Sequence, residues 1–322
     1  MTSHQPVFVP RGLVFPQPVI SEGMEMYSFM LRGTRQRLQA LCDLYLNTPA
    51  NGAVQYRPLS EMVMVTVTAT QKIRSGDPAY INLGYLPQRE TAVWVLVENA
   101  KQVGVEGRVS FFMPFLYVDH SIAMAAGREI FGFAKEYGIC RMPEDPGTNG
   151  KLGIDVWAIE KFQPDAFPQQ KPLFDFAPTE SSILQKVEQA IKNTEDALSS
   201  FIQDLGTPGA LDSEVSMILS AFMTIAHMEK PQFQIVLLKQ FRDIVDGRLA
   251  CYQAILETPA VATKIDGLRL LTNYVATVYQ YDSHPLVDML GLQLENGTAK
   301  TVMAFYFAGD TTIENGTVVW EA

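Results

Sequence analysis

The chain has 322 residues, of which 47% are hydrophobic, and this is enough to bury a large core in one domain. A formal net charge of −10 excludes a basic surface for nucleic acid, and the apolar runs are too short to cross a membrane. The three cysteines lie far apart, which favours a reducing compartment over a disulfide framework. Without a recognisable secretory signal, we expect a cytoplasmic protein.

The first half of the chain is predicted to consist mostly of strands. Over 34–46, leucines and a tyrosine recur at helical spacing, and the Asn-Thr-Pro that follows ends this one helix. Residues 61–70, 91–98 and 108–118 are short runs of β-branched and aromatic residues, which favour strands.

A loop rich in glycine, asparagine and proline covers 144–153. It superficially resembles a phosphate-binding loop, but Asp145 stands where the first glycine would be and Leu152 where a serine or threonine would be. We therefore interpret it as a turn between two strands.

The middle of the chain has a different pattern. Apolar residues repeat at helical spacing from 183 to 205, and Gly206 and Pro208 close that helix. Asp212 or Ser213 caps a second helix that runs to about residue 228. A helical hairpin is therefore expected over about 179–230, as an architectural insertion between two β-rich halves.

The strand pattern then resumes over 233–239, 249–257, 268–281 and 299–307. Asp-Gly and Asn-Gly pairs separate several of these runs, and the two Asn-Gly-Thr sequons are interpreted as hairpin turns. The sequence thus predicts an α+β fold, mostly antiparallel β, in a single domain over 1–322.

Common catalytic motifs are missing from the sequence. Its four histidines have no metal-ligand spacing, and there is no Cys-x-x-Cys pair. There is no Gly-x-Ser-x-Gly nucleophile motif and no Gly-x-Gly-x-x-Gly for a dinucleotide. We expect neither a metal nor a cofactor.

One segment, YVDHSIAMAAGREIFGFAKEYG over 117–138, does point to chemistry. It resembles the active-site segment of the acetoacetate decarboxylase family, in which a Tyr-x-Asp turn leads through small residues to Gly-Arg-Glu, an aromatic residue and the catalytic lysine. The positions that carry this resemblance are Tyr117, Asp119, Ala123, Ala125, Gly127, Arg128, Glu129, Phe133 and Lys135. The Pro-Arg-Gly at 10–12 and the β-rich region from Phe233 onward add weaker support.

The resemblance implies an acetoacetate decarboxylase-like β-barrel with the helical hairpin inserted, a homo-oligomer, and Lys135 as an amine that forms an imine with a keto acid. Such a lysine must be neutral, and burial lowers its pKa by disfavouring the ammonium. Acetoacetate decarboxylase itself is an established example of this effect. The apolar run over 130–134 supplies the expected desolvation.

The resemblance assigns roles to further residues. Glu90, at the start of a predicted strand, matches the position of a family acid/base, with a solvated hairpin residue as the alternative. Phe133 would form a pocket wall and Tyr117 would contact the substrate. Arg128 and Glu129 are expected to form a structural ion pair.

Three positions depart from the family. Glu136 replaces a second lysine, and its charge would raise the pKa of Lys135 unless strand alternation directs it to solvent. Thr66 and Met24 fall near a family carboxylate and a family arginine. These departures weaken acetoacetate as the substrate more than they weaken imine chemistry.

The sequence therefore predicts a lyase that decarboxylates a β-keto acid, such as acetoacetate, through a lysine imine. An aldolase-dehydratase that acts on keto acids such as pyruvate, through the same lysine, is the first alternative. A non-catalytic small-molecule-binding relative is the second. A small keto acid is the expected partner, with no nucleic acid and no membrane.

Overall fold

The computed structural model describes residues 14, 16–101, 109–145, 147–179, 231–271 and 273–322. The strands in this part are β1 (Val19–Arg32), β2 (Tyr56–Ser75), β3 (Leu86–Asn99), β4 (Val109–Val118), β5 (Lys135–Arg141), β6 (Leu152–Ala158), β7 (Gln169–Pro178), β8 (Gln232–Arg242), β9 (Ala250–Leu270), β10 (Tyr274–Val278), β11 (Thr298–Lys300), β12 (Met303–Ile313) and β13 (Thr317–Glu321). The helices are α1 (Arg35–Cys42), the π-helical turn η1 (Asp43–Asn47), α2 (Ser121–Ile130) and α5 (Leu286–Leu290). None of these helices has the length and apolar composition needed to span a bilayer.

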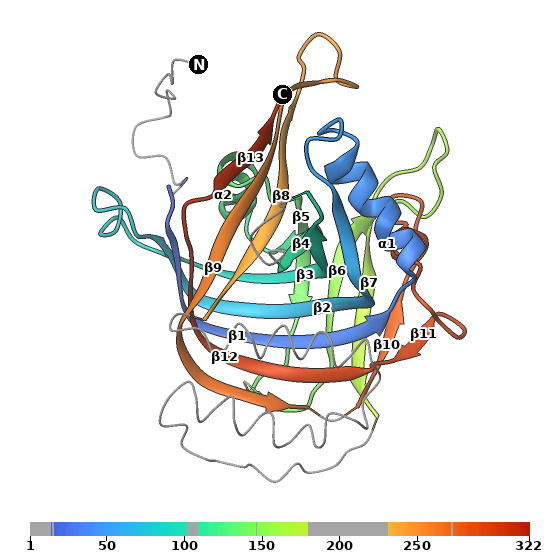
Figure 1. The fold of residues 1–322 in the computed structure, drawn as a ribbon. Coiled ribbons are helices and arrows are strands. Elements are labelled where there is room, and N and C mark those ends of the chain that lie inside the picture. Colours follow the sequence, from blue (N-terminus) through green and yellow to red (C-terminus); the bar gives the residue numbers. More distant parts are fainter. Residues whose placement is uncertain (1–13, 15, 102–108, 146, 180–230, 272) are drawn as a thin grey trace.

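All the strands belong to one 13-stranded sheet, and part of it closes on itself (Figure 1). Strands β4, β3, β2, β1, β12 and β9 are neighbours in that order, and β8 joins β9 back to β4. The β4–β8 pair is parallel, while the other pairs of this ring are antiparallel. A wing of strands β5, β6, β7, β10 and β11 continues from β4 through the parallel β4–β5 pair.

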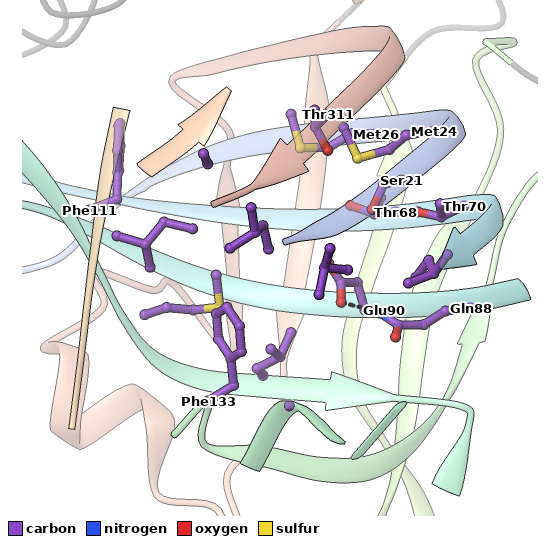
Figure 2. Close-up of a pocket in the computed structure, with 18 of the residues that line it drawn as sticks. Ser21, Met24, Met26, Thr68, Thr70, Gln88, Glu90, Phe111, Phe133 and Thr311 are labelled. Carbon is purple, nitrogen blue, oxygen red and sulfur yellow. Dashed lines mark hydrogen bonds between the residues drawn. The ribbon is translucent and has the colours of Figure 1, made fainter. Parts of the chain in front are cut away.

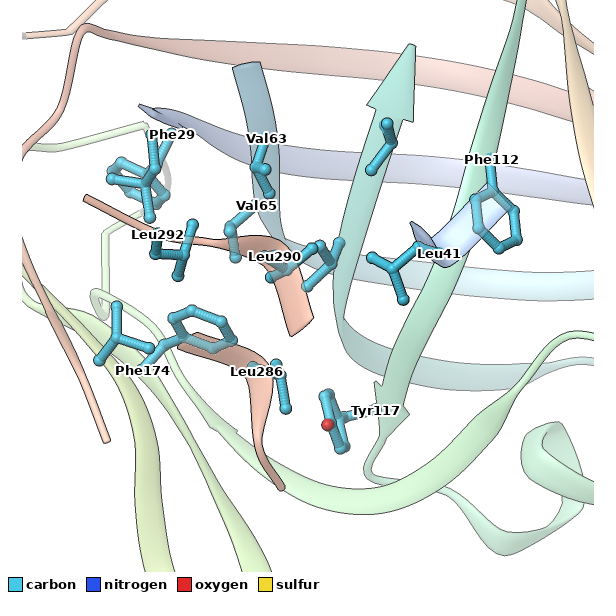
Figure 3. Packing of buried hydrophobic residues seen from close by; sticks show 14 of the residues in the cluster. Phe29, Leu41, Val63, Val65, Phe112, Tyr117, Phe174, Leu286, Leu290 and Leu292 are labelled. Atoms are coloured by element: carbon cyan, nitrogen blue, oxygen red, sulfur yellow. The ribbon is translucent and has the colours of Figure 1, made fainter. Parts of the chain in front are cut away.

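Side chains alternate across the strands, so the ring separates two hydrophobic cores. Met64 and Trp94 belong to the cluster on one face of the sheet. Their neighbours Val65 and Val95 belong to a second cluster, with the wing and helices α1 and α5 (Figure 3). In that second core, the rings of Phe29 and Phe176 stack with 4.0 Å between centroids, which joins the ring to the wing.

Most of the predicted elements are confirmed. The helix expected over 34–46 is α1 followed by η1, and the strands predicted over 61–70 and 91–98 lie within β2 and β3. The strand predicted over 108–118 is β4, whose described residues begin at Val109. The loop over 144–153 joins β5 to β6, as expected of a turn between strands. At Asn296 and Gly297 φ is 52° and 79°, in agreement with a predicted Asn-Gly turn. The predicted hairpin over 179–230 lies, from residue 180 on, outside the described residues.

Two predicted strands were wrong in extent. The run over 268–281 is divided between β9 and β10, and the run over 299–307 between β11 and β12. The cause is the same in both cases, because the chain leaves the ring for the wing, or returns from it, at these points. Helices α2 and α5 were not predicted, and they are short, at ten and five residues.

Candidate active site

A cavity of about 290 Å³ lies inside the ring of strands (Figure 2). Every strand of the ring contributes to its wall, and helix α2 closes part of it through Ala123 and Gly127. One lining residue from each ring strand, in chain order, is Met24, Met64, Glu90, Phe111, Phe233, Leu268 and Phe305. The wall is mainly apolar, with a small number of polar groups, which is typical of a small-molecule site.

Lys135, the first residue of β5, lies in this cavity wall and is only 8% exposed. Its Nζ donates a hydrogen bond to the carbonyl oxygen of Ala123 at 3.2 Å and lies 5.5 Å from the ring centroid of Phe133. Burial lowers the pKa of this amine below its ordinary value, and the charge of Glu90 acts in the opposite direction. The site therefore favours a neutral, nucleophilic lysine.

The turn after α2 delivers this lysine to the cavity. The ring nitrogen Nδ1 of His120 accepts a hydrogen bond from the backbone N–H of Ile122 and so caps the start of the helix. Gly132 ends it with a positive φ of 76°, where an added Cβ would also lie 2.4 Å from the Cα of Lys239. Only glycine fits this position. Phe133 is the next residue, and Lys135 lies three residues after the glycine.

Gly127, on the cavity face of α2, makes room for the lysine side chain. A Cβ at this position would lie 2.7 Å from both Cδ and Cε of Lys135 and 3.0 Å from its Nζ. The Gly-Arg-Glu sequence therefore has glycine at this position because a larger residue would collide with the Lys135 side chain.

Glu90 faces the same cavity from β3 and accepts a hydrogen bond from Nε2 of Gln88. Burial raises the pKa of the Glu90 carboxyl, Lys135 lowers it and Asp119 raises it further. Asp119 is itself fixed by a 2.8 Å hydrogen bond from the backbone N–H of Arg89. Burial thus favours the neutral forms of both the amine and the carboxyl, and pKa shifts of this kind are typical of functional sites.

Glu136 is directed away from the cavity, as strand alternation predicts. Its carboxylate is exposed and lies 3.3 Å from Nε2 of His284 on the other side of β5. The carboxylate that raises the pKa of Lys135 is that of Glu90.

Two predicted roles do not agree with the structure. Tyr117 is 2% exposed and belongs to the core on the opposite face of β4, where its ring lies 5.9 Å from that of His284, so it does not line the cavity (Figure 3). Arg128 and Glu129 form no ion pair in the described part of the chain. Instead, Nη1 of Arg128 donates to the carbonyl oxygen of Lys135 at 2.9 Å, because adjacent helical residues point in different directions.

Two of the three positions that depart from the family, Met24 and Thr66, belong to the interior of the ring. Met24 lines the cavity, and Thr66 accepts a hydrogen bond from Nε1 of Trp94 at 3.0 Å. Among the described residues that line the cavity, the charged ones are Arg74, Glu90 and Lys135.

Several lining residues were missed at the sequence level. Gln88 and Trp94 share one face of β3 with Glu90 because they lie two and four residues from it, and Thr68 pairs with Glu90 from β2. The two-residue alternation along β3 was available as a signal, but cross-strand register was not.

Other candidates for chemistry have structural roles. Within the described residues, no group of three or more His, Cys, Asp or Glu side chains is arranged to hold a metal ion. Cys140 is buried, with its sulfur 3.5 Å from the hydroxyl of Thr91, and burial raises the pKa of its thiol to about 12.

An acetoacetate decarboxylase family model matches residues 5–157, the part of the chain that contains Glu90 and Lys135. No curated protein sequence matches the chain. In the described residues, the fold is a mostly antiparallel sheet with a buried cavity that contains the Lys135 amine. The family match over 5–157 makes this chain similar to the acetoacetate decarboxylase family in that region, and solved acetoacetate decarboxylases share its fold.

Solved structures share this fold along nearly the whole chain at low sequence identity. Acetoacetate decarboxylase from Legionella pneumophila subsp. pneumophila str. Philadelphia 1 gives a TM-score of 0.61 at 13% identity, over 99% of this chain and 93% of that one. An acetoacetate decarboxylase-like enzyme from Sphingomonas wittichii RW1 gives 0.54 at 14% identity, over 98% of each chain. The enduracididine biosynthesis enzyme MppR gives 0.52 at 13% identity, over 99% of each chain.

Replacing the buried amine by an apolar side chain is expected to stabilise the fold. Because the pKa of Lys135 is lowered from 10.5, the unfolded chain binds more protons between the folded-state pKa and 10.5. Stability therefore rises with pH across that window, and the penalty is complete below it. In a Glu90→Gln background, Lys135→Met should raise the free energy of unfolding at pH 7 by about 1.4 kcal/mol for each pH unit that separates 10.5 from pH 7 or from the folded-state pKa, whichever is higher.

Urea unfolding at several pH values measures this difference, which should disappear as the pH approaches 10.5. Lys264→Met is the matched control, since the Lys264 side chain is 59% exposed. A gain that is equal at every pH would contradict the assignment of the penalty to the ammonium.

The substitution Gly127→Ala, which adds one methyl group to α2, should slow imine formation at Lys135 without lowering the free energy of unfolding. In Gly127→Ala, the new Cβ displaces the Lys135 side chain, and its rate of imine formation should fall by about 10²-fold. Helix propensity favours alanine, so the free energy of unfolding should stay constant or rise by up to about 1 kcal/mol. Ala125→Gly, on the same helix, should lose stability but keep its reactivity. Unchanged imine formation in Gly127→Ala would contradict this account.

Proposed function

We propose that this protein is a Schiff-base-forming lyase that decarboxylates a β-keto acid through an imine of Lys135. The observation that supports it best is the buried Nζ of Lys135, with its lowered pKa, in one cavity with Glu90. The ring of strands would correspond to the barrel-like part of the family fold.

In the first stage, the neutral amine of Lys135 attacks the keto carbon of the substrate. The resulting carbinolamine loses its hydroxyl as water when a proton is supplied, and a protonated imine is left. Glu90 is suited to supply that proton, because burial raises the pKa of its carboxyl.

In the second stage, the bond between the α-carbon and the carboxylate breaks. Its electron pair moves to the protonated imine, CO2 leaves and an enamine forms. The enamine takes a proton at the α-carbon, for which Glu90 is again placed, and water then hydrolyses the imine to release a ketone and Lys135. An apolar wall favours the first of these events, since the charges of carboxylate and iminium cancel as CO2 leaves.

An aldolase-dehydratase is the second candidate. It uses the same imine but forms a carbon–carbon bond from the enamine of a keto acid such as pyruvate. MppR, which shares the fold, has been solved in complex with the condensation product of pyruvate and imidazole 4-carboxaldehyde. In this chain, Met24 and Thr66 fall near the positions of the family's pocket arginine and second pocket carboxylate. Their loss supports a substrate other than acetoacetate.

Reductive trapping tests the imine directly. Incubation with acetoacetate, and separately with pyruvate, followed by borohydride should add the reduced ketone to Lys135, as mapped by peptide mass spectrometry. The relative yields rank the two substrate classes. CO2 release from acetoacetate, compared with condensation of pyruvate with an aldehyde, then decides which bond is broken or made.

The trapping experiment has an internal control, because a second lysine, Lys239, resembles Lys135 in its lowered pKa. Lys239 also has a pKa lowered by burial, and its Nζ donates to the carbonyl oxygen of Ile130 at 3.2 Å. It serves as an internal control for general amine reactivity, and Lys135→Met should abolish trapping. An adduct on Lys239 alone, or no adduct from either keto acid, would reject the proposed function.

Removing the Glu90 carboxylate should change both the rate and the pH profile. Glu90→Gln should slow decarboxylation by about 10²- to 10⁴-fold, because the proton donor is lost. It should also move the pH at which Lys135 becomes reactive to a lower value, since the charge that raises the lysine pKa is gone. Glu25→Gln, outside the cavity lining, is the matched control and should change neither the decarboxylation rate nor the pH profile of trapping. A slower reaction with an unshifted trapping profile would contradict the coupling between the two groups.

A further inference from the structure

The cavity is divided into a polar end and an apolar end. In the β2–β3 register, Thr70 lies opposite Gln88, and Thr68 lies opposite Glu90. Figure 2 shows these four side chains together at one end, with Phe111 at the other. A ligand that fills the cavity therefore meets hydroxyl, amide and carboxyl groups on one side only.

Lys135 lies at the boundary between the two ends. Across the sheet it pairs with Leu116, which pairs with Ala92 of β3. Glu90 lies two residues before Ala92 and Trp94 two residues after it, about 7 Å away in each direction along the strand. A keto carbon bonded to Lys135 thus has the polar end on one side and the apolar end on the other.

We call the second end the apolar arm. Its aromatic groups pack edge to face, with ring centroids 6.0 Å apart for Trp94 and Phe111 and 5.3 Å apart for Phe111 and Phe233. The arm consists of Met64, Trp94, Phe111, Phe233, Met303 and Phe305. Its surface offers dispersion and hydrophobic contact.

The size of the cavity exceeds what a four-carbon acid needs. An apolar protein cavity of about 150 Å³ is large enough to hold benzene. The cavity here, at about 290 Å³, is roughly twice as large. Acetoacetate bound at Lys135 would leave the apolar arm without contact to a ligand.

Charge recognition in this cavity is limited. Of the three charged residues among its described lining, Arg74 forms a 2.7 Å ion pair with Glu22, and Lys135 must be neutral to react. Binding energy for the substrate must therefore come mainly from apolar contact.

From this arrangement we infer that the substrate is a β-keto acid with a medium-length alkyl or aryl tail, bound with its tail along the apolar arm. The carboxylate then points to the polar end, where Thr68 and Thr70 offer hydroxyl donors and Glu90 lies next to the α-carbon. This inference rests on the proposed function and deepens it, because it names the substrate class of the same lysine.

Chain-length dependence tests the inference. Acetone, 2-pentanone, 2-heptanone and 2-nonanone are product-like ketones of increasing length that can be trapped on Lys135 with borohydride. The ketone concentration for half-maximal trapping should fall by about 10-fold for each added pair of methylenes until the arm is full. In the same way, kcat/KM for freshly prepared 3-oxooctanoate should exceed that for acetoacetate by about 10²-fold.

A matched pair of variants locates the tail. Met64→Gln puts a polar amide of similar size into the apolar arm and should flatten the dependence on chain length. Met24→Gln makes the same change near the polar end and should leave the dependence on chain length intact. Met64→Leu keeps the site apolar and should retain the dependence, which controls for packing damage.

The outcomes separate this inference from the function on which it rests. If acetone and acetoacetate label Lys135 but longer ketones bind no better, the proposed function stands and the inference fails. If no ketone labels Lys135, the proposed function fails. Calorimetry with butanoate and octanoate then still measures the gain per methylene, and equal affinity for the two acids would overturn the apolar arm as a tail site.

Discussion

The burial of one amine is the constraint on which the site depends. An ammonium that loses its water without gaining a strong partner is costly, so the fold favours the neutral form of Lys135. The lowered pKa of Lys135 requires that its amine be buried, and the ring of strands together with α2 buries it. Glu90 is the one nearby carboxylate that opposes the shift, and its own burial raises the pKa of its carboxyl. Burial therefore shifts the pKa of each group towards its neutral form.

Along the strands of the sheet, side chains that face the cavity alternate with side chains that face the opposite core or solvent. Lys135 faces the cavity, while its neighbour Glu136 faces outward towards His284. In the same way, Leu116 of β4 lines the cavity, while Tyr117 fills the core between ring and wing. Residues adjacent in the active-site segment thus have opposite roles. One stretch of sequence places Lys135 in the cavity and also joins the wing of the sheet to the ring.

The cavity combines the lysine of the matched segment with a mainly apolar wall. The amine and one carboxyl are in place, and these suffice for imine formation and proton transfer. The remaining wall is methionine, aromatic and aliphatic, with hydroxyl and amide groups at one end. A wall of this kind selects a ligand by the area of its apolar part rather than by its charge. In the proposed function, the fold positions the lysine and the carboxyl, and the side chains of the ring select the substrate.

By itself, the sequence showed the resemblance to a family and predicted a buried lysine and most of the strands, because these depend on local patterns: an ungapped segment, an apolar run before Lys135, and β-branched alternation. It did not determine which side chains share the cavity, since that depends on cross-strand register. Gln88, Thr68 and Trp94 share a cavity with Lys135 only because β2, β3, β4 and β5 align in one order. The burial of Tyr117 and the contact of Gly127 with Lys135 were likewise decided by the tertiary structure. A residue's type limits what it can do, but its face and its neighbours are set only when distant strands pair.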